Sequence, residues 1–238
     1  GDQTGRKRHR SAALASWVAA RAPLTHSTRF DDTKHVTCEG RTDEYALFAP
    51  RSEERLAAIM LRHGAGGRGA DMVSIWKPLA NREHIVLIAP QLPRDLAFES
   101  AAPSVFRCVL ADAERSASVD PQRVYLFGYS MGGYLTFDGA MFDSDLFAAA
   151  GVYAAAINPD YYAIVDSAKR KMPIAIYIGD RDQFFPIAQA RGTRALLEGH
   201  GFPVHYTELP GQDHAYAPVS DRVNADAWAY LSSARLSQ

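Results

Sequence analysis

The sequence has almost no net charge, no long apolar run and few cysteines, and each of these shortages excludes a class of protein. Its 238 residues carry a formal net charge of −1, so no overall field would draw the chain to nucleic acid or to acidic lipid. A helix that spans a bilayer needs about 20 consecutive apolar residues, and no run in this sequence approaches that length. We therefore expect neither a nucleic-acid partner nor a membrane span.

The cysteine content excludes a disulfide-dense scaffold. Cys38 and Cys108 are the only two cysteines, and they have no C-x-x-C spacing. They either bond to each other or are small buried apolar side chains. A bond would favour an extracytoplasmic or secreted location. The chain also lacks H-E-x-x-H or any comparable group of metal ligands, and so we expect no metal.

The first 30 residues differ in character from the rest of the chain. A basic cluster at 6–10 precedes a short Ala-rich apolar run, which is the layout of a signal peptide. Because that run is short and weak, an N-terminal helix with a solvated basic start is the favoured interpretation. No repeat, low-complexity tract or Ser/Pro-rich linker follows. We therefore predict an N-terminal extension (1–30) and a single catalytic domain (31–238).

Strand-like and helix-like segments alternate through the remaining sequence. Apolar runs that are typical of buried strands lie at 43–50, 55–67, 84–90, 120–128, 146–155, 173–180 and 203–211. Segments with helical character lie at 70–83, 104–118, 186–201 and 221–236. This alternation predicts an α/β fold with a mostly parallel central sheet flanked by helices. The connections are short, so no large lid is expected, and the chemistry should gather at the carboxyl ends of the strands.

One serine stands between glycines at the end of a predicted buried strand. The stretch 126–135 reads LFGYSMGGYL, and its residues 128–132 match G-x-S-x-G. The motif follows a strand and precedes a helical stretch, as a sharp strand-to-helix turn requires. Glycines at this turn let strand and helix approach closely. The pattern therefore predicts Ser130 as a nucleophile that is lifted clear of the sheet.

A serine nucleophile needs a base and an acid. His214 lies in a loop after the last predicted strand, and so the chain order Ser…Asp…His favours it as the base. Asp180 and Asp182 both follow the strand at 173–180. We predict Asp182 as the acid, because it precedes an apolar pair at 184–185 that could shield its carboxylate from water.

The tetrahedral intermediate needs hydrogen-bond donors for its oxyanion. One donor should be the backbone N–H of the residue after the nucleophile, which is Met131. The other should come from the loop HGAGG at 63–67, where Ala65 is the candidate. A phosphate-binding loop would instead require G-x-x-x-x-G-K-[ST], which is absent.

Together these motifs identify a resemblance. H-G-A-G-G, then DPQRVYLFGYSMGG, then G-x-x-D-x-x-x-P at 179–186 and a C-terminal histidine resemble α/β-hydrolases, in particular esterases of the phospholipase/carboxylesterase and polyhydroxybutyrate-depolymerase-like (LpqC-like) group. The resemblance implies an α/β-hydrolase fold and the roles already predicted for the serine, the aspartate, the histidine and the two amides. Arg62, where the group usually has an apolar residue, and Gln212-Asp213, where glycines are common, depart from its pattern.

The leading hypothesis is a serine carboxylesterase that acts on soluble short-chain or aryl (feruloyl-like) esters through an acyl-enzyme. It needs no metal or organic cofactor, and its partner is a small-molecule ester. Candidate substrate-binding residues are His63, Trp76, Tyr129, Phe184 and Phe185. The alternatives are a peptidase of the prolyl-oligopeptidase kind and a non-catalytic binding module on the same fold.

Overall fold

The structure, a computed structural model, describes residues 33–92 and 104–236. The predicted N-terminal extension (1–30), with its basic cluster, lies outside these residues. The described residues contain one eight-stranded sheet, in the order β1-β2-β4-β3-β5-β6-β7-β8. The strands are β1 (Thr33–Cys38), β2 (Arg41–Phe48), β3 (Leu56–Arg62), β4 (Val86–Pro90), β5 (Val119–Tyr129), β6 (Ala149–Tyr153), β7 (Ile174–Gly179) and β8 (Val204–Leu209).

The sheet is parallel except at one end. The strands from β4 to β8 in the sheet order run parallel to one another, whereas β1 and β2 form an antiparallel ribbon against β4. The predicted mostly parallel sheet is thus confirmed. Because parallel strands end at one edge, the loops that follow them meet there.

Continuous apolar runs form the central strands because helices cover both faces of the sheet. Every residue of β4, β6 and β7 is buried. The first strand is different: its sequence TKHVTC alternates exposed and half-buried residues up to the buried Cys38. A search for apolar runs misses such an edge strand, and it was not among the predicted elements.

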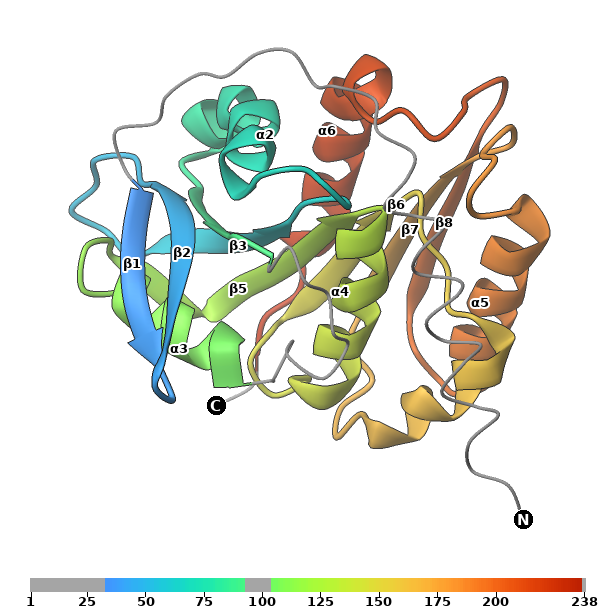
Figure 1. The fold of residues 1–238 in the computed structure, drawn as a ribbon, viewed down its shortest axis with the longest axis horizontal. Helices are drawn as coiled ribbons and strands as arrows, with labels where there is room; N and C mark the ends of the chain where they lie inside the picture. The colour runs from blue at the N-terminus through green and yellow to red at the C-terminus, as the bar shows by residue number, and fades with distance from the viewer. Residues whose placement is uncertain (1–32, 93–103, 237–238) are drawn as a thin grey trace.

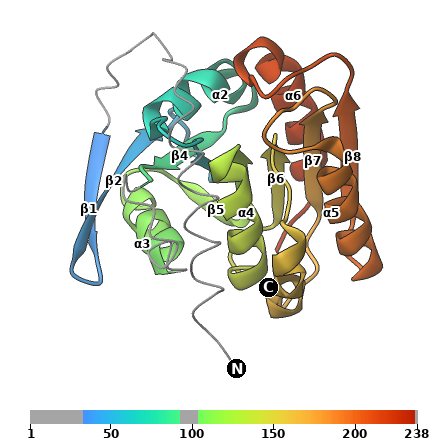
Figure 2. The ribbon, with the colours of Figure 1, turned by 45° about the vertical axis from the view of Figure 1, so that its right-hand side comes forward.

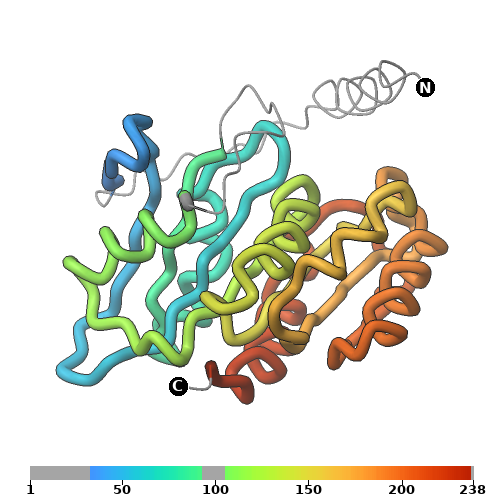
Figure 3. Tube along the Cα trace, turned by 90° about the horizontal axis from the view of Figure 1, so that it is seen from below, coloured from blue at the N-terminus to red at the C-terminus, as the bar shows by residue number. Residues whose placement is uncertain are grey.

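Helices form a layer on each face of the sheet (Figures 1 and 2). One layer holds α2 (Gly69–Glu83) and α6 (Ser220–Leu231), and the other holds α3 (Ser104–Ala113), α4 (Met131–Phe142) and α5 (Ile187–Gly199). A 3₁₀ helix, η2 (Pro159–Ser167), was not predicted, and α3 is shorter than the predicted 104–118. Figure 3 shows the chain progressing from the first strand, in blue, to α5, in orange, across the molecule.

A disulfide ties the antiparallel end of the sheet to the helix layer. Cys38 of β1 bonds to Cys108 of α3, with the two Cα atoms 6.0 Å apart. Of the two interpretations that the sequence allowed, the structure therefore has the bonded pair. In the described part of the chain no helix combines the length and the apolarity that crossing a bilayer requires.

Candidate active site

Ser130 lies at the junction between β5 and α4, in a backbone conformation that few residues other than glycine adopt. Its φ is 56° and its ψ is −121°, and strain of this kind persists where the surrounding structure enforces it. The backbone N–H of Ser130 donates to the carbonyl of Tyr153 at 3.0 Å. Gly128 allows the tight turn, because a Cβ there would lie 2.2 Å from the carbonyl oxygen of Gly132. The predicted strand-to-helix turn is therefore present.

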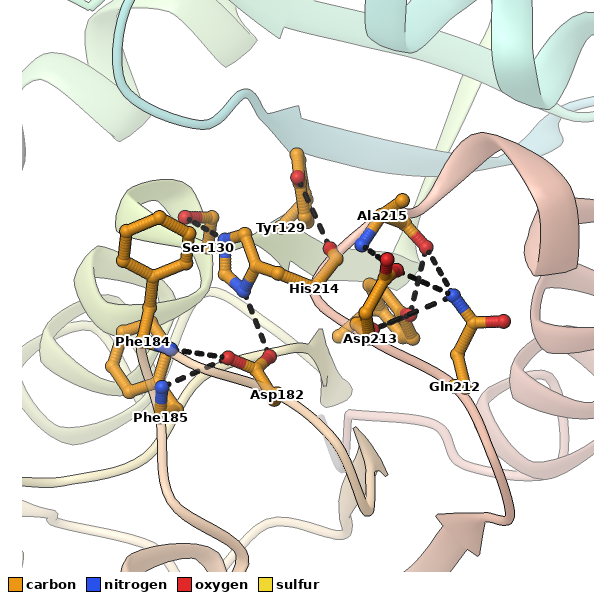
Figure 4. A network of polar contacts seen from close by, with 10 residues as sticks. Tyr129, Ser130, Asp182, Phe184, Phe185, Gln212, Asp213, His214 and Ala215 are labelled. Atoms are coloured by element: carbon orange, nitrogen blue, oxygen red, sulfur yellow. Dashed lines mark hydrogen bonds and ion pairs between the residues drawn. The ribbon is translucent and has the colours of Figure 1, made fainter. Parts of the chain in front are cut away.

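His214 lies in the loop that follows β8 and faces the serine (Figure 4). Its Nε2 is 2.8 Å from Ser130 Oγ, although the two residues are 84 positions apart in the chain. The imidazole is largely shielded, with 12% of the side chain exposed. This geometry lets Nε2 accept the hydroxyl proton.

Asp182 holds the other nitrogen of that ring. Asp182 Oδ2 is 2.7 Å from His214 Nδ1, and the carboxylate is fully buried. Its second oxygen accepts the backbone N–H groups of Phe184 and Phe185 at 2.8 and 2.9 Å. The carboxylate is therefore fixed by three hydrogen bonds, and it favours the tautomer in which Nδ1 carries the proton and Nε2 is free to act as a base.

Asp180, the rival for this position, points elsewhere. It is exposed, and its Oδ1 accepts the backbone N–H of Gly211 at 2.7 Å. Asp180 therefore fixes the start of the loop that carries His214 and has no hydrogen bond to the imidazole. Of the two aspartates that the sequence offered, the structure places the carboxylate of Asp182 beside His214 Nδ1.

The loop after β3 supplies the other side of the site. Ala65 packs against a small apolar cluster of Leu92, Met131 and Leu135, so the residues of the two candidate oxyanion donors belong to the same cluster. Met131 is the first residue of α4, and no carbonyl within that helix can accept its N–H. Gly64 contacts the nucleophile, since a Cβ on it would lie 3.2 Å from the Cβ of Ser130.

A polar network that the sequence did not reveal fixes this loop. His63 Nδ1 bonds to the carbonyl of Gly64 at 2.8 Å, and His63 Nε2 accepts the N–H of Leu92 at 2.9 Å. Gln91 Nε2 lies 3.0 Å from the same ring nitrogen, and Gln91 Oε1 accepts the N–H of Gly69. Burial lowers the pKa of His63 to about 4, so the ring is neutral near pH 7. The sequence offered one signal for the role of Gln91, which is that a polar residue directly follows the buried strand β4.

The residues suggested as substrate contacts have different surroundings. Trp76 is fully buried and packs edge-on against Phe127. It therefore lies in the core, and the structure does not support the expectation that it lines a pocket. Both ring nitrogens of His63 are occupied within the protein, which favours a supporting role for that residue. Phe184 is partly exposed with its ring centroid 4.7 Å from that of His214, whereas Phe185 is buried behind the same imidazole.

The residues that depart from the esterase pattern have structural partners. Arg62 is 3% exposed, and its guanidinium lies over the ring of Phe106 at 4.8 Å. Burial lowers its pKa to about 10. The side chain of Gln212 donates to the carbonyl of Ala215, and Asp213 Oδ1 accepts the N–H of Ala215. Gln212 and Asp213 therefore shape the histidine loop. Across the two described ranges, no three His, Cys, Asp or Glu side chains come together as metal ligands.

Comparison with known proteins places this chain in a family of hydrolases. The sequence model of the dienelactone hydrolase family matches residues 93–235, more than half of the chain. A curated relative, acyl-protein thioesterase 1 of Gibberella zeae, is 23% identical over 217 residues, which cover 75% of this chain and 92% of that protein.

Solved structures share the fold. Esterase 2 of Thermogutta terrifontis, in a form phosphoramylated by tabun, aligns with a TM-score of 0.71 at 17% identity, covering 88% of this chain and 97% of that one. A thermostable esterase aligns with a TM-score of 0.68 at 22% identity over 86% of this chain. This chain spans only 64% of the length of that second esterase.

Proposed function

This chain belongs to the dienelactone hydrolase family, and from that premise we propose that it is a serine carboxylesterase that cleaves soluble short-chain or aryl esters through an acyl-enzyme. That it is a serine hydrolase of ester or thioester bonds follows from its relatives. The acyl-enzyme mechanism is supported by one observation above all. Two hydrogen bonds of 2.8 and 2.7 Å join Ser130 Oγ to His214 and His214 to a buried Asp182.

The geometry supports a two-step reaction. Ser130 Oγ attacks the ester carbonyl while His214 Nε2 takes the hydroxyl proton, and Asp182 stabilises the resulting imidazolium. The backbone N–H groups of Ala65 and Met131 would bind the oxyanion. His214 then gives its proton to the leaving alkoxide, which departs as the alcohol. Water attacks the acyl-enzyme with the same histidine as base, and this step releases the acid and restores the serine.

The surroundings of the serine support a small or aromatic acyl group. Leu92, Met131 and Leu135 form a buried apolar cluster against which Ala65 packs, and the partly exposed ring of Phe184 lies next to His214. An apolar wall favours apolar acyl groups over charged ones. The single sheet supports the treatment of residues 31–238 as one catalytic unit, and the Cys38–Cys108 bond supports an extracytoplasmic location.

Thioesters are the second candidate substrates. A thioester would pass through the same acyl-enzyme, and one relative of this chain is named an acyl-protein thioesterase. A peptidase activity and a non-catalytic binding role remain as outcomes of the test described next.

The proposal is tested by labelling with a serine-directed phosphonate and by hydrolysis of p-nitrophenyl esters of graded chain length, feruloyl esters, matched thioesters and peptide anilides. We expect labelling of the wild type, no labelling of Ser130→Ala, and a loss of turnover on the order of 10⁶ in that variant. Short-chain or aryl oxygen esters should be the best substrates. Preferential cleavage of thioesters or anilides would overturn the substrate assignment, and an unlabelled wild type would indicate a binding module.

The two aspartates give a matched pair of variants for the same assay. Asp182→Asn should lower turnover by roughly 10⁴, because the amide favours the wrong imidazole tautomer. Asp180→Asn should cost less than about tenfold, since Asp180 contacts only the backbone of Gly211. The opposite ranking would contradict the assignment of the acid.

A further inference from the structure

Two tyrosines occupy equivalent positions next to the candidate site. Tyr129 is the last residue of β5 and Tyr153 is the last residue of β6, and the two are paired across the parallel ladder. Their ring centroids are 5.9 Å apart. Neither hydroxyl has a part in the reaction described above, although both belong to the edge of the sheet where the site lies.

Both hydroxyls reach the backbone of the loop that carries His214. Tyr129 Oη donates to the carbonyl of His214 itself at 3.2 Å. Tyr153 Oη lies 3.2 Å from the carbonyl of Asp213 and 3.0 Å from that of Ala215. Three successive carbonyls of this loop are therefore acceptors for two phenols, and Figure 4 shows the contact between the hydroxyl of Tyr129 and the carbonyl of His214.

The same two tyrosines also contact Ser130 through their main chains. Tyr129 directly precedes Ser130, and the backbone carbonyl of Tyr153 accepts the N–H of Ser130 at 3.0 Å. One residue thus holds the serine with its main chain and the histidine loop with its side chain. The ring of Tyr216 stacks on both phenols, at 5.3 and 4.9 Å between centroids, and so their rings cannot turn away without disturbing the core.

We propose that Tyr129 and Tyr153 are positioning residues that set the distance between His214 Nε2 and Ser130 Oγ. The inference rests on the proposed role of His214 as the base. A displacement of about 1 Å in a reacting group can lower the rate a hundredfold. Because the loop that carries His214 has no regular secondary structure, it needs hydrogen bonds such as these to fix the position of the imidazole. Burial raises the pKa of Tyr129 to about 12, and that of Tyr153 is raised further for the same reason. Both phenols therefore remain protonated donors over the range in which an esterase acts.

The competing explanation is that the two tyrosines only pack in the core. Tyrosine-to-phenylalanine variants separate the two explanations, because they keep the ring and remove only the hydroxyl. Tyr125 provides the matched control. It lies on the same strand, β5, and its hydroxyl also donates to a backbone carbonyl, that of Ala234 at 2.9 Å. That carbonyl is in the C-terminal segment and not in the histidine loop.

The experiment measures kcat, KM, the rate of phosphonate labelling and the melting temperature for Tyr129→Phe, Tyr153→Phe and Tyr125→Phe. We expect kcat and the labelling rate to fall about tenfold in Tyr153→Phe and about threefold in Tyr129→Phe, with KM within about twofold of the wild type. Tyr125→Phe should lower the melting temperature by a similar amount and leave kcat unchanged. This split between kcat and stability is not expected of a side chain that only packs.

Two results would overturn the inference while leaving the proposed function intact. One is a wild-type kcat in both site variants, and the other is an equal loss of kcat in Tyr125→Phe. If Tyr153→Phe does not fold, Tyr129→Phe decides between the same outcomes. A wild type that neither hydrolyses esters nor reacts with the phosphonate would contradict the proposed function and, with it, the base that these tyrosines would position.

Discussion

Two loops flank Ser130 at the carboxyl edge of the sheet, and they are held in opposite ways. The oxyanion loop (residues 63–69) follows β3 and is fixed by side chains. His63, its first residue, bonds to the backbone on both sides of its ring, and Gln91 reaches across from the end of β4. The part of this loop that would act on a substrate is a backbone N–H.

The histidine loop (residues 210–216) follows β8 and is fixed largely through its backbone. Its carbonyls at 213–215 accept the tyrosine hydroxyls, and the carbonyl of Gln212 accepts the N–H of Arg181 at 2.9 Å. The part of this loop that would act on a substrate is a side chain. In the oxyanion loop, side chains are the anchors and a backbone N–H would act on the substrate. In the histidine loop, backbone carbonyls are the anchors and the imidazole would act. The anchoring bonds therefore leave the functional group of each loop available and oriented.

Among variants that keep the candidate catalytic residues, the largest effect is expected when either loop is displaced from the sheet. A Cβ at Gly132 would lie 2.3 Å from the carbonyl oxygen of Arg62, and a Cβ at Gly179 would lie 2.2 Å from that of Gln212. Since the obstructing atoms are backbone, Gly132→Ala should displace the oxyanion loop and Gly179→Ala the histidine loop. We expect each variant to lose at least roughly a hundredfold in kcat/KM and to unfold at a lower temperature.

Gly199→Ala is the control for these two variants, because a Cβ there meets nothing within 4 Å. Gly199 is the last residue of α5, so alanine should leave kcat/KM unchanged and add up to about 1 kcal/mol of stability. A Gly179→Ala protein that keeps more than a tenth of wild-type kcat/KM would show that close backbone packing does not hold the histidine loop.

The sequence predicted what depends on local pattern. Continuous apolar runs located the buried strands, and the context of G-x-S-x-G located the turn at Ser130. The apolar pair at 184–185 and the spacing from Gly179 to Pro186 favoured Asp182 over Asp180 as the acid, and the structure places the Asp182 carboxylate beside His214 Nδ1. Each of these signals is contained in a short window, because burial on both faces, a tight turn and a motif spacing all constrain neighbouring residues.

The supports of the site depend on contacts between distant segments, and no short window contains them. Gln91 bonds to a histidine 28 positions away, and Tyr153 bonds to carbonyls about 60 positions away. Trp76 has the same helical spacing whether it lines a pocket or the core, and only the docking of α2 places it against Phe127. The strand β1 was missed because its apolar residues, Val36 and Cys38, alternate with exposed polar residues and so form no continuous apolar run.

The next prediction concerns pH and His63, the imidazole that anchors the oxyanion loop. Burial lowers the pKa of His63 from 6.5 to about 4. Between these values the unfolded chain binds a proton that the folded protein excludes. His63 therefore contributes stability above pH 6.5 that is progressively lost as the pH falls towards 4, by up to about 3 kcal/mol.

Urea unfolding at a series of pH values checks this prediction. The free energy of unfolding of the wild type should fall more steeply between pH 6.5 and 4 than that of His63→Gln, which carries no titrating group at this position. Parallel curves for the wild type and His63→Gln would contradict the assigned burial of the neutral ring.

The smallest expected effect on catalysis comes from removing the disulfide, which forms no bond with either loop. The disulfide joins β1, at the antiparallel end of the sheet, to α3 and closes a segment with a sequence separation of 70. Replacing both Cys38 and Cys108 with serine frees that segment in the unfolded chain and should cost about 2–5 kcal/mol of stability. The loops at 63–69 and 210–216 keep all their anchors in this variant, and so kcat measured well below its melting temperature should stay within about twofold of the wild type. Urea unfolding and ester hydrolysis at the same temperature measure the two quantities side by side. A fall in kcat as large as that expected for Tyr153→Phe would show that the positions of the two loops depend on the β1 end of the sheet, and that their local anchors alone do not fix the site.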